Sequence, residues 1–189
     1  MLDKNVEFFR MVLKREKETE LKSASLPEGF NFVKFKKGDE KSWAEIETSV
    51  LEFENVESAK EYFENKFLSY LSEIERRTLF IENENGEKIA TFTAWWRYTG
   101  ERRYPFMEWV AVKPRYQGKG LGKALISEGV KLMVAIEGDC DMYIPTQTWS
   151  HKAIKLYRWA GFDFETEEKF PGGIENRTLE GLEVIKDLI

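Results

Sequence analysis

Three glycines at alternate positions, Gly118, Gly120 and Gly122, form the part of the chain best suited to hold an anion. They lie in the run KPRYQGKGLG, between a strand-like segment and a segment whose apolar residues have helical spacing. Glycine lets backbone N–H groups approach a ligand closely, and the first turn of a helix carries unpaired N–H donors and a partial positive charge. The run therefore predicts a phosphate site, with Lys119 and Lys123 adding positive charge at its edge.

Two common phosphate motifs do not fit this run. A P-loop ending at residues 122 and 123 would need a glycine and a hydroxyl residue at positions that are held by Gln117 and Ala124. A dinucleotide-binding GxGxxG pattern, begun at either of the first two glycines, ends on Lys123 or Leu125 instead of glycine. The pattern that fits is Gln/Arg-x-x-Gly-x-Gly, which begins at Gln117.

With this pattern the sequence resembles the GNAT (Gcn5-related N-acetyltransferase) superfamily over roughly residues 28–165. A second motif supports the resemblance, because AIKLYRWAGF at 153–162 is similar to the family's A-I-x-L-Y-x-x-x-G-F signature. The two motifs occur in the family's order and at its separation. One departure is Ser150, which stands where the family often has asparagine, and this puts a ligand contact from that position in doubt.

The resemblance implies an α/β fold and acetyl-CoA as co-substrate, without a metal. The expected sheet is mixed and mostly antiparallel, is flanked by helices, and has splayed parallel strands 4 and 5 that hold the coenzyme between them. Pantetheine would pair with the backbone of residues 110–112, and the pyrophosphate would lie on the N–H groups of residues 117–122. The residues expected to bind acetyl-CoA are Val110, Ala111, Val112, Gln117, Gly118, Lys119, Gly120, Leu121, Gly122, Lys123 and Ser150.

The reaction implied by the resemblance is direct attack of an amine on the thioester. An alkyl amine has a pKa of about 10 and arrives mostly protonated, so a base must remove a proton first. Relatives carry a carboxylate for this purpose on the fourth strand, and Glu108 stands at that position. Strand alternation puts Glu108 on the apolar face with Phe106 and Val110, opposite Trp109, and burial there would raise its pKa. The open alternative is a glutamate that faces solvent near a strand end.

A proton donor for the leaving thiolate is also implied. Tyr157 matches the family's general-acid tyrosine, and the alternative is a core tyrosine in the stripe with Ala153 and Ala160. His151, the single histidine, lies in the first turn of the same expected helix. A surface or capping role is the favoured interpretation of His151, although it could contact the substrate.

Two further groups could belong to the acceptor site. Trp95 and Trp96 adjoin on an expected strand, so one should face each side of the sheet; core packing is the favoured role. Glu47, Glu52 and Glu54 lie at the end of an expected helix, in a region that forms the acceptor wall in relatives. These glutamates could hold a cationic amine, and a solvated helix face is an equally good interpretation.

Hydrophobic spacing predicts the elements that must position these residues. We expect an amphipathic helix at 2–17, with a polar linker completing an N-terminal part at 1–25, and an acetyltransferase domain at 26–189. Within the domain we expect helices at 43–50, 57–75, 121–137, 150–160 and about 179–188. We expect strands at 30–35, 78–81, 89–97, 105–112 and 142–144, the last stopping at Pro145, with an Asn85-Gly86 hairpin turn.

Composition limits the setting and the partners. The 189 residues carry a net charge of −5 and no long basic stripe, so nucleic acid is not an expected partner. One histidine, one cysteine and no CxxC or HExxH pattern exclude the usual metal sites. Cys140 between two aspartates should have a raised pKa and fits a reducing cytosol. No apolar run is long enough to cross a membrane, and the N-terminus does not read as a secretory signal, so a cytoplasmic location is expected.

These observations favour an acetyl-CoA-dependent N-acetyltransferase acting on a small-molecule or peptide amine. The alternatives are a non-catalytic acyl-CoA-binding sensor and an accessory module whose N-terminal helix docks a partner. The acceptor and the acyl length cannot be read from the sequence, because substrate walls vary while the coenzyme site stays the same. Relatives commonly form dimers, so a homodimer stays open.

Overall fold

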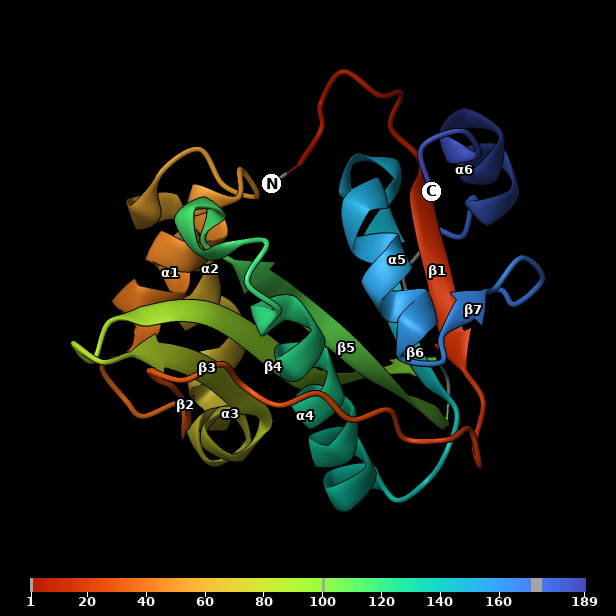
Figure 1. Ribbon diagram of the computed structural model, residues 1–189. Helices are drawn as coiled ribbons and strands as arrows, with labels where there is room; N and C mark the ends of the chain where they lie inside the picture. Colours follow the sequence, from red (N-terminus) through yellow and green to blue (C-terminus); the bar gives the residue numbers. More distant parts are fainter. Residues whose placement is uncertain (1, 100, 171–174) are drawn as a thin grey trace. The chain divides into compact units, whose positions relative to one another are not determined.

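The computed structural model describes residues 2–99, 101–170 and 175–189 (Figure 1). Within these residues seven strands form one sheet in the order β2-β3-β4-β5-β6-β1-β7, which confirms the mixed, mostly antiparallel α/β fold. Strands β5 (Arg102–Val112) and β6 (Met142–Gln147) are the parallel pair, and they pair at Phe106↔Tyr143. The chain divides into two compact units: 23–93 with 109–129, and 2–22 with 94–108 and 130–189.

The first unit contains an antiparallel run of three strands. β2 (Phe30–Lys34) pairs with β3 (Thr78–Asn83), which pairs with β4 (Lys88–Thr99). Asn83 and Gly86 close the expected hairpin, because the Gly86 N–H donates to the Asn83 carbonyl. The expected strands at 30–35, 78–81 and 89–97 are therefore confirmed.

The helices of the first unit are α1 (Glu40–Ser49), α2 (Val56–Phe67) and α3 (Leu71–Arg77), and α1 packs on α2. The single helix expected over 57–75 is wrong, since a 3-10 turn at Leu68–Tyr70 separates α2 from α3. Tyr70 leaves the helical region, with φ −119° and ψ 44°. The buried rings of Trp43, Phe63 and Phe80 form part of the core.

The same unit includes the end of β5 and the start of α4 (Leu121–Glu137). Trp109 has φ +55°, in the left-handed region that a bulky residue rarely adopts. The regular alternation expected through Glu108, Trp109 and Val110 is therefore wrong at this residue. A 3-10 turn at Pro114–Tyr116 and the glycine loop then lead into α4.

The second unit contains β1 (Arg10–Arg15), which pairs with β6 and with β7 (Asp163–Phe164). The N-terminal helix expected at 2–17 is wrong in this part of the chain. Met11, Val12 and Leu13 are all almost fully buried, which is typical of an interior strand covered on both faces. The boundary at residue 25 stays a prediction.

Strand β6 continues past Pro145, contrary to the expected stop. Pro145 lies opposite Val12 of β1, and the Val12 N–H donates to Thr178 Oγ1 at 2.9 Å instead of to β6. This pair needs no N–H from residue 145, so proline is tolerated there. The second unit also holds α5 (His151–Trp159) and α6 (Thr178–Ile185), which confirm the two expected C-terminal helices.

Candidate functional site

The loop before α4 presents a row of backbone donors to solvent. Gly118 and Gly120 have φ +78° and +84°, and nothing lies within 4 Å of a Cβ placed on either. Within the described residues, the N–H groups of Gly118, Lys119 and Gly120 donate to no protein acceptor. The first helical hydrogen bond runs from the Ala124 N–H to the Gly120 carbonyl, so the N–H groups of the first turn also point outward. This geometry suits a phosphate or pyrophosphate group.

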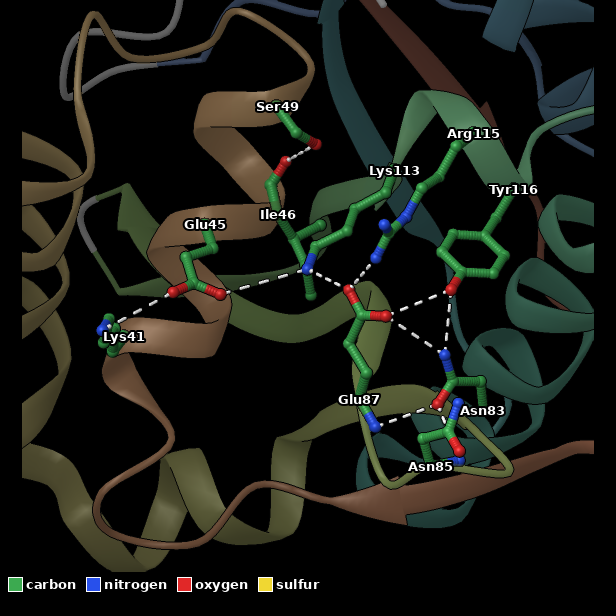
Figure 2. Close-up of polar contacts among 10 residues, drawn as sticks. All are labelled: Lys41, Glu45, Ile46, Ser49, Asn83, Asn85, Glu87, Lys113, Arg115 and Tyr116. Atoms are coloured by element: carbon green, nitrogen blue, oxygen red, sulfur yellow. Dashed lines mark hydrogen bonds and ion pairs between the residues drawn. The ribbon is translucent and has the colours of Figure 1, made fainter.

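Glu87, at the end of the β3–β4 hairpin, fixes the start of this loop (Figure 2). Lys113 Nζ lies 3.0 Å from Glu87 Oε1, and the Tyr116 hydroxyl donates to Oε2 at 3.1 Å. Arg115 also bonds to this carboxylate, and Asn83 Nδ2 donates to the Tyr116 hydroxyl at 2.9 Å. Burial raises the pKa of Glu87, but the bonds from Lys113, Tyr116 and Arg115 outweigh it and lower the pKa to about 2.

Sequence reasoning missed Glu87. Nothing in its immediate neighbours predicts its partners, because Lys113 and Tyr116 lie 26 and 29 residues further along the chain. Its charge balances the basic residues beside the glycines, so the loop is held without consuming the outward N–H groups.

The strand residues expected to hold pantetheine lie directly before the loop. Ala111 is buried, and Val110 and Val112 are half-buried. The Gln117 side chain folds back and donates from Nε2 to the Val112 carbonyl at 2.8 Å. A ligand that pairs with this carbonyl must therefore displace the Gln117 amide, whereas the donors at Gly118–Gly120 stay open.

Glu108 lies in the second unit, and only 5% of it is exposed. This burial rules out the solvent-facing alternative. Its Oε1 accepts from Arg97 Nη2 at 2.7 Å and Nε at 3.0 Å. The neighbouring β4 therefore supplies a counter-ion that the sequence interpretation did not include.

Helix α5 carries the other expected residues. Tyr157 is buried. Ser150 is at the N-cap position, but its side chain makes no capping hydrogen bond. His151 is buried rather than on the surface, and its Nε2 lies 3.4 Å from Asp3 Oδ2.

An aromatic cluster and a buried acid lie in the first unit. Trp43 lies 5.1 Å from Trp109 between ring centroids, and Tyr62 lies 5.2 Å from Trp109. Glu47 of α1 is only 1% exposed, and its Oε1 has no partner within the described residues. Burial, with the nearby Glu52 carboxylate, raises the pKa of Glu47 well above its usual value. A solvated helix face is therefore wrong for this glutamate.

The second unit also contains Trp95 with Trp96, and Cys140, for which residue spacing and neighbours predicted the orientation and the pKa. The rings of Trp95 and Trp96 stack at 4.3 Å, so they do not point to opposite sides of the sheet. Burial, together with Glu137, Asp141 and other acids, raises the pKa of the Cys140 thiol, as its neighbours predicted. A catalytic thiolate is not supported at this position.

The described residues contain no cluster of metal-ligating side chains. None of the helices in this part of the chain combines the length and apolarity that a membrane crossing needs.

Comparisons with known proteins agree with the fold. A family model described as the acetyltransferase (GNAT) family matches residues 41–162. A search of curated protein sequences finds no match.

Several solved structures are similar to this chain. A GCN5-related N-acetyltransferase from Sphaerobacter thermophilus has a TM-score of 0.59 and 19% identity over 85% of this chain and 49% of its own. A GNAT-family acetyltransferase from Colwellia psychrerythraea has a TM-score of 0.60 and 17% sequence identity, over 84% of this chain and 54% of its own. Glucosamine-6-phosphate N-acetyltransferase from Arabidopsis thaliana has a TM-score of 0.55 and 21% sequence identity, over 75% of this chain and 97% of its own. The chain spans about half the length of the first two structures.

Proposed function

This chain belongs to the acetyltransferase (GNAT) family, whose model covers most of it, and from that premise we propose that it is an acetyl-CoA-dependent N-acetyltransferase. The proposed reaction moves an acetyl group to a primary amine by direct attack on the thioester. The observation that carries the proposal is the row of outward N–H groups at Gly118–Gly120, continued by the first turn of α4. Such a row fits the pyrophosphate of a coenzyme A thioester.

We assign the coenzyme contacts to the residues predicted from the sequence. The N–H groups of residues 117–122 would bind the pyrophosphate, with Lys119 and Lys123 at the edge. The backbone of residues 110–112 would pair with pantetheine once Gln117 releases the Val112 carbonyl. Ser150 remains a proposed contact, and this role is compatible with a side chain that does not cap α5.

Two side chains are proposed for the proton transfers. Glu108 would accept a proton from the acceptor ammonium, and Arg97 would hold the carboxylate in place. The amine nitrogen then forms a bond to the carbonyl carbon as the carbon–sulfur bond breaks. Tyr157 would give its proton to the departing thiolate, and the second proton that the nitrogen loses on becoming an amide would replace it. A cytoplasmic location and a homodimer stay predictions.

A calorimetric titration with acetyl-CoA, followed by detection of free thiol with a panel of primary amines, tests the proposal. The enzyme should bind acetyl-CoA and release thiol only when an amine is present. Gly120→Asp should lose binding by at least a hundredfold, because it adds a negative charge and a side chain to the phosphate site. Gly86→Asp is the matched control, since Gly86 also has a positive φ and open space but lies in a hairpin turn.

Tight binding without thiol release for any amine would favour the alternative of an acyl-CoA sensor. Absence of binding at millimolar acetyl-CoA would contradict both. The alternative of an accessory module depended on an N-terminal helix that docks a partner. Residues 10–15 form a strand paired with β6 instead, so we do not propose it.

A further inference from the structure

We propose that Trp43, Glu47, Tyr62 and Trp109 form the pocket for the acceptor's ammonium, that Phe53 covers it, and that the acceptor carries an aromatic or apolar group next to its amine. This inference rests on the proposed function and adds to it the class of acceptor. All of these residues lie in the first unit.

Three polar atoms in this cluster are buried without partners within the described residues. They are Trp43 Nε1, Glu47 Oε1 and Trp109 Nε1. Buried polar side-chain atoms in folded proteins are nearly always hydrogen-bonded, because losing water without a replacement is unfavourable. Of the three, Glu47 Oε1 is the acceptor that an ammonium group can pair with, whereas the two indole N–H groups are donors and would need an acceptor atom elsewhere.

The geometry brings these groups together. Trp43 and Glu47 are four residues apart on α1, so they lie on one helix face. The Trp43 ring is 5.1 Å from the Trp109 ring at 70°, and it is stacked on Tyr62 at 6.4 Å and 9°. Helices α1 and α2 and the end of β5 thus bring three ring systems together, and the buried carboxyl group of Glu47 lies one helical turn from the Trp43 ring position.

The ring faces of the cluster already attract an ammonium group in this structure. Lys66 Nζ lies 5.5 Å from the Tyr62 ring centroid and 5.8 Å from that of Trp109. Aromatic faces bind cations through the negative potential of their π electrons. Glu52 adds negative charge near Glu47, and an ammonium group beside Glu47 would favour the ionised form of its carboxyl group. A cationic ligand is therefore favoured over an anionic one.

Phe53 indicates what the ligand carries besides its ammonium. Its ring stacks on Trp109 at 5.6 Å and 25° and lies 5.4 Å from Tyr62. It sits in the short segment between α1 and α2, where Leu51 has φ +74°, a conformation that leucine rarely adopts. A flat or apolar group on the acceptor would take the place of the Phe53 ring when this segment moves.

The position of Trp109 connects the pocket to the reaction. Trp109 directly follows Glu108, the proposed proton acceptor, and directly precedes residues 110–112, the proposed pantetheine strand. Its left-handed conformation turns the ring into the cluster with Trp43 and Tyr62. An amine held here would lie beside the residue that begins the proposed pantetheine segment of the same unit.

The test compares phenethylamine with 2-phenylethanol, which has the same ring but no ammonium. The wild-type protein should bind phenethylamine in calorimetry and acetylate it, and it should bind the alcohol at least tenfold more weakly. Glu47→Gln keeps the side-chain size and removes the charge, so it should weaken phenethylamine binding and raise its KM at least tenfold. Binding of acetyl-CoA should stay within twofold. Glu57→Gln is the control, because Glu57 is an exposed glutamate in the first turn of α2.

Phe53→Ala is a second variant, and it should lower the KM for phenethylamine several-fold by removing the cover. Equal KM values in wild type and Glu47→Gln would overturn the inference, as would equal affinity for the amine and the alcohol. If the wild type acetylates glucosamine 6-phosphate but not phenethylamine, the proposed function stands and this inference fails. If no amine yields thiol and acetyl-CoA does not bind, the proposed function itself fails.

Discussion

At the scale of single residues, the charged neighbours of Glu87, Glu108 and Glu47 distinguish the proposed roles of these three glutamates. Glu87 is surrounded by Lys113, Arg115 and Tyr116, Glu108 is bonded to Arg97, and Glu47 has no counter-ion within the described residues. Opposite charges favour the ionised form of a carboxyl group, and burial disfavours it. Identical side chains are therefore suited to anchoring a loop, accepting a proton and receiving a cation.

Glu87→Gln should destabilise the fold and loosen the loop. The pKa of Glu87 is lowered from 4.5 to about 2, so its contribution is fully present above pH 4.5 and is lost as the pH falls toward 2. We expect a loss of about 1–2 kcal/mol in the free energy of unfolding at pH 7, because the partly exposed pairs are screened by solvent. Urea unfolding at pH 7, 4.5 and 3 measures this.

The difference in unfolding free energy between Glu87→Gln and wild type should be largest at pH 7, change little down to about pH 4.5, and shrink between pH 4.5 and 3. The exposed Glu84→Gln in the same hairpin should match wild type at every pH. Calorimetry should also show about fivefold weaker acetyl-CoA binding for Glu87→Gln alone. A difference in unfolding free energy that does not change with pH would show that the Glu87 carboxylate does not stabilise the fold by its charge.

Glu108→Gln should fold, bind acetyl-CoA and lose turnover by about a hundredfold or more, since general-base catalysis contributes about 10²–10⁴-fold. The amide keeps the size of the side chain but cannot accept the proton. Steady-state thiol release across pH 6 to 10 measures the loss. The variant should recover part of its rate at high pH, where more of the amine is already neutral. Wild-type turnover would exclude Glu108 from the mechanism.

Tyr157→Phe removes the proposed proton donor and nothing else from the side chain. We expect kcat to fall by about a hundredfold with unchanged acetyl-CoA affinity, because the hydroxyl acts only as the thiolate leaves. Single-turnover kinetics with phenethylamine measures the acetyl-transfer step directly. A variant as fast as wild type would mean that Tyr157 is a core residue.

At the scale of elements, α4 combines two tasks. Its first turn faces the proposed coenzyme site, and further along Gly129 lets the helix approach β4 of the same unit. A Cβ at Gly129 would lie 2.7 Å from the Phe92 ring, which is fully buried. The glycine is thus required by packing, although alanine is the better helix former.

Gly129→Ala should therefore destabilise the protein by about 1–3 kcal/mol, the usual cost of overpacking a core. Helix propensity alone predicts that alanine raises the free energy of unfolding by about 1 kcal/mol, so propensity and overpacking change the stability in opposite directions. Urea unfolding of Gly129→Ala and wild type measures the difference in the free energy of unfolding. Ala135→Gly at an exposed position of α4 calibrates the propensity effect. A stabilised Gly129→Ala variant would show that Phe92 can move aside.

At the scale of the whole molecule, ligand binding and stability are linked. A ligand that binds only the folded protein at a hundred times its Kd adds about 2.7 kcal/mol to the free energy of unfolding. For a chain of this length acetyl-CoA should then raise Tm by about 5–10 °C. Differential scanning calorimetry with and without acetyl-CoA measures the shift, and Gly120→Asp should show none.

Local sequence determined the glycine loop before α4, the proposed coenzyme site, and most of the helices and strands. The glycines at 118 and 120 and the start of α4 depend on neighbours within a few residues, where backbone freedom and helix-end donors act. The hairpin at Gly86 and the α5 motif follow for the same reason. Family membership could be inferred from these two motifs, since both depend on short spacings.

Only the tertiary structure decided β1, Glu87 and Glu47. The spacing of apolar residues at 2–17 also fits a helix, and pairing with β6, more than 120 residues away, makes residues 10–15 a strand. Glu87 acquires its partners through the return of β5 beside the hairpin, and Glu47 becomes a buried acid through the packing of α1 on α2 and Trp109. Burial and charge pairing arise from contacts between distant segments, so residue spacing alone could not reveal them.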